Sequence, residues 1–413
     1  MTIVLQSNTD HLGPANTYFR RDLPMCASMT AAIVGCGDIA HAHACGYQLA
    51  GVDIIAYIDP LAVARDQFRQ EYGGGVGYES IEEMFDAGVT PDMISICAWH
   101  LLHAPLTVAA ARPGVKAILC EKPMAVGLGD ADGMIEACEA AGVKLAISHQ
   151  RRFTLGWEKG RELVAAGHIG EPQFAVTKLG HGLLNCGTHA IDGARFVLGD
   201  PTPQWVMGAV HRDTGRIERD VPIEDGCLGL VHFDNGIQLM IESDLDMEGA
   251  TVGTFQIRGA DGMMEVGETH CRTMTSQGWE EHDLGVPREQ IDVIGGQANG
   301  RQAKELVAWI DGSSETHRCA AAQSRVTVEI MMALLESARQ NAVIQLPLQE
   351  MGYPLDLMLE EGKLPHHDEA DTYDIRAFLK RDDIDEAAYT ELRATGMGHH
   401  PIMRTLWDRA QAD

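Results

Sequence analysis

Short apolar runs alternate with amphipathic segments in the first third of the chain. Five runs consist almost wholly of aliphatic and small residues: 30–35, 52–58, 92–98, 115–120 and 143–148. Such runs are typical of strands that are buried on both faces of a parallel sheet. The segments between them have helical spacing, and Leu61–Tyr72 carries its charges on one face. This alternation predicts a doubly wound parallel sheet, that is, a Rossmann domain.

The pattern changes after residue 150. A helical segment, a strand and a second helix are predicted first, at 156–166, 172–178 and 187–198. Longer alternating segments follow, at 204–211, 227–233, 237–243 and 251–259. Asn235-Gly236 between two of them is a strong hairpin signal. We therefore expect a second domain built on an open sheet, with late helices at 302–310 and 326–340 packed back across the molecule.

These boundaries divide the chain into four parts. We expect an N-terminal arm over 1–28, a dinucleotide-binding domain over 29–150 and a substrate domain over 151–348. The extension over 349–413 is rich in Asp and Glu, and its pattern indicates no role. The arm contains charged residues and lacks the apolar region of a signal peptide.

Composition narrows the class of partner. The chain has 413 residues, of which 45% are hydrophobic, and 60 acidic against 32 basic residues give a net charge of −28. Such a charge repels nucleic acid and anionic membranes, and no apolar run is long enough to cross a bilayer. Ten cysteines without a CxxC pair are typical of reduced thiols. We expect a cytoplasmic enzyme with a small-molecule substrate.

The first predicted strand runs into a glycine-rich turn of the GxGxxA type, Gly35-Cys36-Gly37-Asp38-Ile39-Ala40. The first glycine permits the tight turn, the second permits approach of a pyrophosphate, and the helix N-terminus stabilises its charge. Asp59 ends the next strand, where a carboxylate binds the ribose hydroxyls and repels a 2′-phosphate. The prediction is NAD instead of NADP. The alternative is a solvent-facing turn aspartate before Pro60.

The strand at 115–120 leads directly into Glu121-Lys122-Pro123. Pro123 biases Lys122 toward an extended conformation at the carboxyl end of the strand, where ligands bind in open α/β sheets. A lysine there can donate to a substrate oxygen and stabilise a developing alkoxide. A surface lysine in a loop is the equally weighted alternative.

Taken together, four features resemble the Gfo/Idh/MocA family, which includes glucose–fructose oxidoreductase and inositol dehydrogenases. They are the GCGDIA turn, Asp59, the Glu121-Lys122-Pro123 triplet and Gly187-Thr188-His189, and the likeness extends from about Met29 to Leu348. The resemblance implies a Rossmann domain followed by an α/β domain with a large, mostly antiparallel sheet. It also implies a homo-oligomer, either a dimer or a tetramer.

The family's catalytic pattern is the triplet lysine with an Asp-x-x-x-His pair. Carried over, the lysine is Lys122 and the histidine is His189, but Asn185 stands where the aspartate usually stands. The hypothesis is that His189 is the general acid or base, Lys122 polarises the reacting oxygen, and Asn185 positions the substrate. A buried histidine at the domain interface is the alternative for His189. Asp192 is assigned no chemistry.

The resemblance also suggests residues near the cofactor and the substrate. Ala98, Trp99 and His103 occupy a segment that lies near the nicotinamide in the family, and Glu121 and Lys122 are included with them. Trp99 either stacks on the cofactor or fills the core. Arg152 either contacts the substrate or forms a salt bridge between domains.

The predicted function is hydride transfer between NAD and a secondary alcohol or ketone of a sugar, sugar derivative or cyclitol. Two alternatives stay open: a glycosidase-like lyase that recycles NAD through transient sugar oxidation, and a non-catalytic NAD-binding sensor. The paired histidines lack ligand spacing, so no metal site is expected.

Overall fold

The computed structural model describes residues 29–245, 254–291, 296–381 and 384–412. The predicted arm over 1–28 and the start of the predicted strand over 251–259 lie outside these residues. Two compact units are present, one ending at Asp374 and the other beginning at Ile375. Each unit is described by itself.

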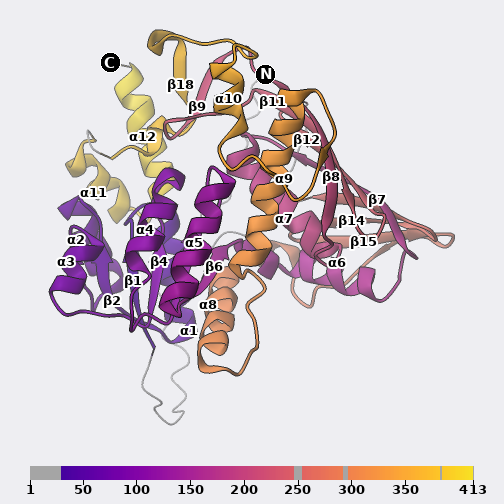
Figure 1. The fold of residues 1–413 in the computed structure, drawn as a ribbon. Coiled ribbons are helices and arrows are strands. Elements are labelled where there is room, and N and C mark those ends of the chain that lie inside the picture. Colours follow the sequence, from indigo (N-terminus) through magenta and orange to yellow (C-terminus); the bar gives the residue numbers. More distant parts are fainter. Residues whose placement is uncertain (1–28, 246–253, 292–295, 382–383, 413) are drawn as a thin grey trace. The chain divides into compact units, whose positions relative to one another are not determined.

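The N-terminal part of the larger unit is a six-stranded parallel sheet with the strand order β3-β2-β1-β4-β5-β6 (Figure 1). Its strands are β1 (Thr30–Val34), β2 (Asp53–Ile58), β3 (Val76–Tyr78), β4 (Met93–Ile96), β5 (Ala117–Glu121) and β6 (Lys144–Ser148). Its helices are α1 (Asp38–Ala50), α2 (Ala62–Tyr72), α3 (Ile81–Asp86), α4 (His103–Ala110) and α5 (Leu128–Ala141). The chain order reverses between β1 and β4, and this switch point is where open sheets of this kind bind ligands.

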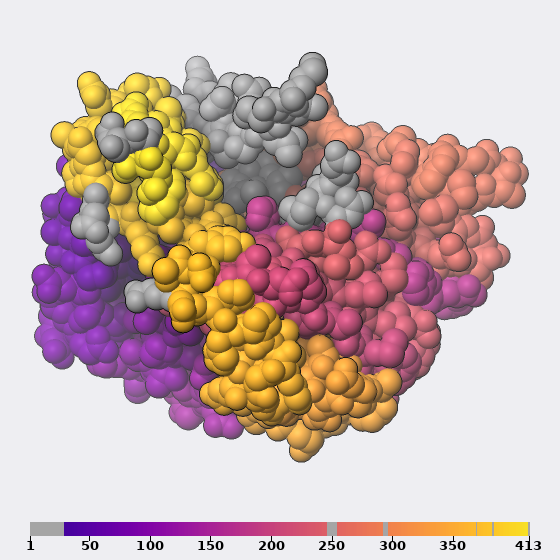
Figure 2. Space-filling model, turned by 90° about the horizontal axis from the view of Figure 1, so that it is seen from above, coloured from indigo at the N-terminus to yellow at the C-terminus, as the bar shows by residue number. Residues whose placement is uncertain are grey.

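The second sheet has nine strands in the order β16-β15-β14-β13-β7-β12-β11-β8-β17. All neighbouring pairs are antiparallel except β12 and β7, which are parallel. Its strands are β7 (Pro172–Leu179), β8 (Pro203–His211), β11 (Gly226–Phe233), β12 (Gln238–Ser243), β13 (Phe255–Gly259), β14 (Met263–Gly267), β15 (His270–Thr275), β16 (Gly278–Glu281) and β17 (Ile344–Gln345). The fold class expected from the sequence is therefore confirmed. In Figures 1 and 2 the end of this sheet that carries β14 to β16 projects outward.

Four longer helices follow β6 in the chain: α6 (Leu155–Ala165), α7 (Thr188–Val197), α8 (Gly296–Asp311) and α9 (Ala321–Gln340). Helix α8 packs closely on α1. A Cβ added at Gly46 of α1 would lie only 2.8 Å from the Cβ of Asn299 on α8. Helix α9 contacts both α5 and the strands β8 and β11. Helix α9 thus contacts strands of both sheets, whereas α8 packs on the Rossmann domain.

A small three-stranded sheet with the order β10-β9-β18 completes the larger unit. It consists of β9 (Gly215–Glu218), β10 (Val221–Pro222) and β18 (Thr372–Asp374), and α10 (Pro354–Glu360) precedes β18. Arg219 and Asp220, which join β9 to β10, both have positive φ, as a two-residue hairpin loop of type I′ requires. This pair lacks the usual Asn-Gly signal, and the sequence did not predict the hairpin.

The smaller unit begins at Ile375 and contains α11 (Glu386–Ala394) and α12 (His399–Ala412). It has its own apolar cluster, formed by Phe378, Tyr389, Ile402, Met403 and Leu406. The hydroxyl of Tyr389 lies 2.7 Å from His399 Nδ1. The smaller unit thus has a hydrophobic core of its own.

Candidate active site

The glycine-rich turn joins β1 to α1 as predicted. Gly35 has φ +86°, and a Cβ there would lie 2.9 Å from the backbone carbon of Cys97, so only glycine fits. A Cβ at Gly37 would meet nothing within 4 Å, and Gly37 precedes α1 without a side-chain cap. The start of α1 is therefore not blocked by a side chain at position 37 or capped by one, as an approaching pyrophosphate requires. Asp38 is exposed and Ile39 is half-buried beside this turn.

Asp59 is hydrogen-bonded to this turn. Its Oδ2 accepts a hydrogen bond of 2.8 Å from the backbone N–H of Cys36, and its Oδ1 accepts one of 2.8 Å from Leu61. The carboxylate thus lies at the end of β2 and is directed toward the glycine-rich turn. This is the position that a ribose-binding carboxylate requires. Together with Gly37, it shows that the chain's own residues fit a bound dinucleotide.

Lys122 directly follows β5, at the carboxyl edge of the parallel sheet. Its Nζ donates a hydrogen bond of 3.1 Å to the backbone carbonyl of Asn185, which belongs to the second domain. Burial lowers the pKa of Lys122, and the nearby Arg219 adds to that effect. The lysine predicted from the triplet and the asparagine predicted from the family pattern are therefore neighbours.

A buried polar network lies behind Lys122. His43 Nε2 is 2.8 Å from Glu121 Oε1, and His43 Nδ1 is 2.9 Å from Ser95 Oγ. Ser148 Oγ is 3.3 Å from His43 Nε2. Glu121 is 3% exposed, and its second oxygen accepts from the amide of Lys122. Glu121 was predicted to contact the cofactor, but the described contacts place its carboxylate inside this network.

Asn185 lies on a π-helical turn, Leu183–Gly187, that immediately precedes α7. The sequence predicted a helix from residue 187, so the wide turn adds four residues before the predicted start. The backbone N–H of Leu183 donates a 2.6 Å hydrogen bond to Glu224 Oε1 and holds the turn in place. The amide nitrogen of Asn185 is buried and has no hydrogen-bond partner among the described residues. A side-chain amide left in this state can serve a ligand.

His189 lies in the first turn of α7 and is 4% exposed. Its Nδ1 has no hydrogen-bond partner in the described part of the chain. Burial lowers the pKa of His189 well below its ordinary value, and the charges of Arg151 and Lys122 lower it further. The ring is therefore neutral near pH 7 and can accept a proton.

Asp192, one turn further along α7, was assigned no chemistry, but it is the most heavily paired carboxylate near the site. Arg152 Nε and Nη2 donate to its two oxygens at 2.7 and 2.8 Å. His149 Nδ1 lies 2.9 Å from Asp192 Oδ2. Burial raises the pKa of Asp192, but Arg152 and His149 outweigh burial and hold that pKa well below its usual value.

Arg152 is 1% exposed, and Asp200 also lies 2.9 Å from its guanidinium. A further N–H of Arg152 donates to the carbonyl of Arg318 at 3.0 Å. These contacts involve all three nitrogens of the guanidinium. The geometry favours a salt bridge over a substrate contact for Arg152, but both carboxylates belong to the same domain as Arg152, so it is not the bridge between domains that was expected.

The segment expected near the nicotinamide lies at the end of β4. Both ring nitrogens of His103 approach carbonyl oxygens, that of Pro123 at 2.7 Å and that of Ala98 at 3.1 Å. The imidazole thus connects the Ala98 segment to the lysine loop. Trp99 is half-buried, with the guanidinium of Arg219 6.0 Å from its ring centroid.

His100 belongs to the same neighbourhood, although the sequence did not single it out. It is 2% exposed, and its Nε2 has no hydrogen-bond partner among the described residues. Burial lowers the pKa of His100 to about 3, and Arg219 contributes to the shift. The sequence feature that could have indicated His100 is its position directly after Trp99.

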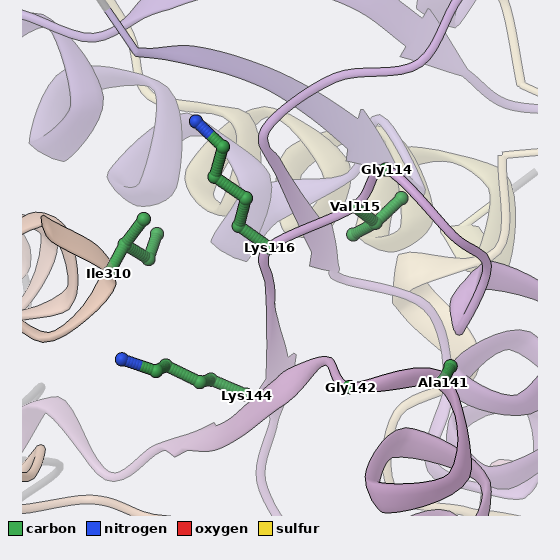
Figure 3. Close-up of a pocket in the computed structure, with 7 residues that line it drawn as sticks. All are labelled: Gly114, Val115, Lys116, Ala141, Gly142, Lys144 and Ile310. Atoms are coloured by element: carbon green, nitrogen blue, oxygen red, sulfur yellow. The ribbon is translucent and has the colours of Figure 1, made fainter.

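The pocket of Figure 3 is a different place. It has a volume of about 430 Å³ and lies beside the amino ends of β5 and β6, between Lys116 and Lys144. Lys116 Nζ is 2.7 Å from an oxygen of Asp92, and Lys144 donates to the carbonyl of Trp309. Because both lysines already have partners, and because ligands bind at the opposite edge of such a sheet, this pocket is not the candidate site.

A search of the described residues finds no group of three His, Cys, Asp or Glu side chains arranged to hold a metal ion. Within the same residues, no helix is long and apolar enough to cross a membrane.

A parallel sheet with a glycine-rich turn is followed by a second domain, which contains a largely antiparallel sheet and helix α7. This arrangement defines a two-domain dinucleotide-dependent oxidoreductase. Residues 29–149 match the oxidoreductase family with an NAD-binding Rossmann fold named GFO_IDH_MocA, and residues 176–265 match the GFO/IDH/MocA C-terminal domain. The two matches together cover about half of the chain. The chain belongs to the Gfo/Idh/MocA family and is an NAD-dependent oxidoreductase.

Relatives and solved structures agree with this assignment. The chain is 29% identical over 253 residues to 1,5-anhydro-D-fructose reductase of Ensifer adhaerens, covering 56% of this chain and 74% of the relative. It is 26% identical to D-glucoside 3-dehydrogenase of Escherichia coli K12, covering 52% and 70%. An oxidoreductase of Agrobacterium radiobacter, solved with NAD⁺, L-tartaric acid and magnesium, superimposes with a TM-score of 0.67 at 20% identity, covering 77% of this chain and 98% of that one. The last comparison concerns the fold alone.

Proposed function

We propose that the protein transfers a hydride between NAD and a secondary alcohol or ketone of a sugar, sugar derivative or cyclitol. The observation that carries the proposal is the 3.1 Å hydrogen bond from Lys122 Nζ to the carbonyl of Asn185, four residues before His189. It brings a cation, an unpaired amide and a neutral imidazole to the carboxyl edge of the dinucleotide-binding sheet. Those three groups are what oxidation of an alcohol requires from the protein.

Each group has a proposed role. When NAD is bound, its nicotinamide supplies the hydride acceptor. Lys122 donates to the reacting oxygen and stabilises the negative charge that develops on it. His189 takes the hydroxyl proton, and the Asn185 amide donates to a neighbouring hydroxyl of the substrate.

The cofactor contacts are also part of the proposal. The amides at the start of α1, beyond Gly35 and Gly37, would hold the pyrophosphate, with Asp38 and Ile39 beside it. Asp59 would accept hydrogen bonds from the ribose hydroxyls. Trp99 would lie against the nicotinamide, and Ala98 and His103 would shape that side of the site.

The named relatives support the substrate class. One is a reductase of an anhydro sugar and another is a dehydrogenase of glucosides. Both substrates are neutral polyhydroxylated rings. Such rings suit a site that presents a cation, an amide and an imidazole.

The second domain also supports self-association. The nine-stranded sheet exposes Met207 on β8 and Leu228 on β11, with 48% and 42% of their surfaces accessible. We propose that a second copy of the chain covers this face, giving a dimer or tetramer. Light scattering is expected to show an oligomer that Leu228→Lys weakens, and a monomeric wild type would contradict the proposal.

The first experiment follows NADH absorbance with the purified protein, NAD and a panel of sugars, sugar acids, glycosides and inositols. We expect the signal to grow with one class of polyol. The variant His189→Gln is expected to lose at least about a hundredfold in kcat while its affinity for NAD, measured by calorimetry, is unchanged. A flat trace with glycoside cleavage would indicate the NAD-recycling lyase, and a flat trace without cleavage would indicate the sensor.

A further inference from the structure

His149 is a second imidazole beside the candidate active site, and no part of the proposed mechanism uses it. It directly follows β6, at the same carboxyl edge of the sheet as Lys122. Its ring centroid lies 5.9 Å from that of His189, with the two rings edge to face. The side chain is buried, since the residue is 1% exposed.

The surroundings of His149 suit a proton acceptor. Asp192 Oδ2 is 2.9 Å from its Nδ1, an ion-pair distance without the geometry of a hydrogen bond, and the Thr188 hydroxyl is 3.4 Å from its Nε2. Asp192 is ionised in the folded protein, because Arg152 and His149 hold its pKa low against the effect of burial. An ionised carboxylate on one nitrogen stabilises a positive charge on the imidazole and leaves the other nitrogen to exchange the proton.

His189, by contrast, has no carboxylate among its described contacts. Asn185 occupies the position from which the family's aspartate acts, and an amide cannot stabilise an imidazolium as a carboxylate does. Burial, Arg151 and Lys122 all disfavour a proton on His189, and His149 also contributes. A proton taken up by His189 therefore needs a further acceptor.

Among the residues that the structure describes, the neighbouring arginines and the Cys319 thiol do not offer one. Arg151 is paired with Glu268, and Arg152 is committed to Asp192 and Asp200. Cys319 Sγ donates to the backbone carbonyl of His149. Burial raises the pKa of the Cys319 thiol above its ordinary value, so the thiol stays neutral.

We propose that His149, supported by Asp192, is a positioning residue that receives the proton from His189 and so takes the part of the carboxylate absent at position 185. This inference rests on the proposed function. In the oxidative direction the substrate O–H bond breaks and its proton passes to His189, while bound NAD would supply the acceptor for the hydride from carbon. His189 then releases a proton to His149, whose imidazolium faces Asp192 until the proton reaches solvent.

The decisive test compares His149→Gln in two backgrounds, one with asparagine and one with aspartate at position 185. His149→Gln keeps a polar side chain of similar length but removes the proton acceptor, and we expect kcat at pH 7 to fall about 10- to 100-fold. In the background of Asn185→Asp, His189 has its own carboxylate. The same replacement is then expected to change kcat by no more than about threefold, so that the two effects are strongly non-additive.

A purely structural role of His149 would give equal losses in both backgrounds, and that result would overturn the proposal. Thr188→Val is the second variant, because it removes the hydroxyl near His149 Nε2 while keeping the shape of the side chain. It is expected to lower kcat several-fold, with rescue by Asn185→Asp. If His149→Gln does not fold, an unchanged kcat in Thr188→Val overturns the proposal.

A third measurement does not depend on turnover. Titration of ¹⁵N-labelled histidines by NMR is expected to show a higher pKa for His189 in His149→Gln than in the wild type, because one group that disfavours its proton is gone. An unchanged pKa of His189 would overturn the coupling even if the enzyme proves active. Conversely, a shifted pKa with no polyol turned over would overturn the proposed function and leave the coupling intact.

Discussion

Two buried histidine–carboxylate pairs flank the candidate site, and they are built differently. On the Rossmann side, His43 contacts Glu121 at 2.8 Å, and the other neighbours of this pair are the hydroxyls of Ser95 and Ser148 and the backbone amide of Lys122. On the side of the second domain, His149 lies 2.9 Å from Asp192, which also binds Arg152 through both oxygens. Glu121 therefore depends on an imidazole, whereas Asp192 has a permanent cation.

This difference indicates separate tasks. A carboxylate held by arginine keeps its charge, so the proposed role of His149 has a constant partner. Glu121 has no such partner, and its network is suited to holding the backbone that carries Lys122. The first pair thus supports position, and the second supports proton movement.

The largest expected effect concerns the arginine. Arg152→Met leaves Asp192 buried without its main counter-charge, and we expect a loss of about 3–5 kcal/mol in the free energy of unfolding. His43→Leu is the matched variant on the other side. It is expected to cost about 1–3 kcal/mol, because Glu121 can take up a proton when its partner is removed. Urea denaturation at pH 7 measures both, and a greater loss in His43→Leu would contradict the comparison.

The next effect concerns activity. Lys122→Met removes the cation that the Rossmann side presents to the substrate, and kcat is expected to fall about 10²- to 10³-fold. The control is Lys116→Met, at the amino end of the same strand, where Lys116 is paired with Asp92. Steady-state rates with the substrate identified from the panel measure both variants. A similar loss in both would mean that Lys122 acts through stability alone.

The same contrast explains which features the sequence predicted. The strands of the parallel sheet were found because each is an unbroken apolar run, and the glycine-rich turn because its shape depends on local backbone conformation. The exception is β3, which has only three residues within a glycine-rich stretch. On this side, sequence neighbours largely determine structure.

The second side depends on contacts between distant residues. His149 and Asp192 are 43 positions apart in the chain, and only the packing of α7 against the end of β6 brings them together. The predicted helix began at residue 187, but Asn185 lies on a π-helical turn before it, and that turn depends on a hydrogen bond from Leu183 to the distant Glu224. No local sequence pattern indicates the contact between His149 and Asp192 or the π-helical turn. Asn185 in place of the family's aspartate did indicate that the site is unusual.

A pH-dependent effect of intermediate size is expected at Glu224, which supports the π-helical turn. Burial raises the pKa of Glu224 to about 7. The folded state therefore keeps a proton that the unfolded state loses above about pH 4.5, and folding becomes less favourable as the pH rises from there to about 7.

Glu224→Gln removes this dependence and retains an oxygen that accepts from Leu183. Relative to the wild type, we expect its free energy of unfolding to increase between pH 4.5 and 7.5 by roughly 2–3 kcal/mol. Buried histidines such as His189 have the opposite pH dependence, but they are present in both proteins and cancel in the difference. Urea denaturation across this range measures the effect, and a constant difference between the two proteins would show that the carboxyl is ionised throughout.

The smallest expected effect concerns Asp59 in the Rossmann domain. The experiment tests whether this carboxylate does more than support the structure of the turn. Asp59 accepts from Cys36 and Leu61, and this structural role alone accounts for both of its oxygens. Asp59→Asn keeps one acceptor oxygen and removes the charge that would repel a 2′-phosphate. We expect the preference for NAD over NADP, measured as a ratio of calorimetric Kd values, to fall about tenfold, or about 1.4 kcal/mol. If the ratio is unchanged while both affinities fall together, Asp59 only holds the turn, and the Rossmann side contributes position without electrostatic selection.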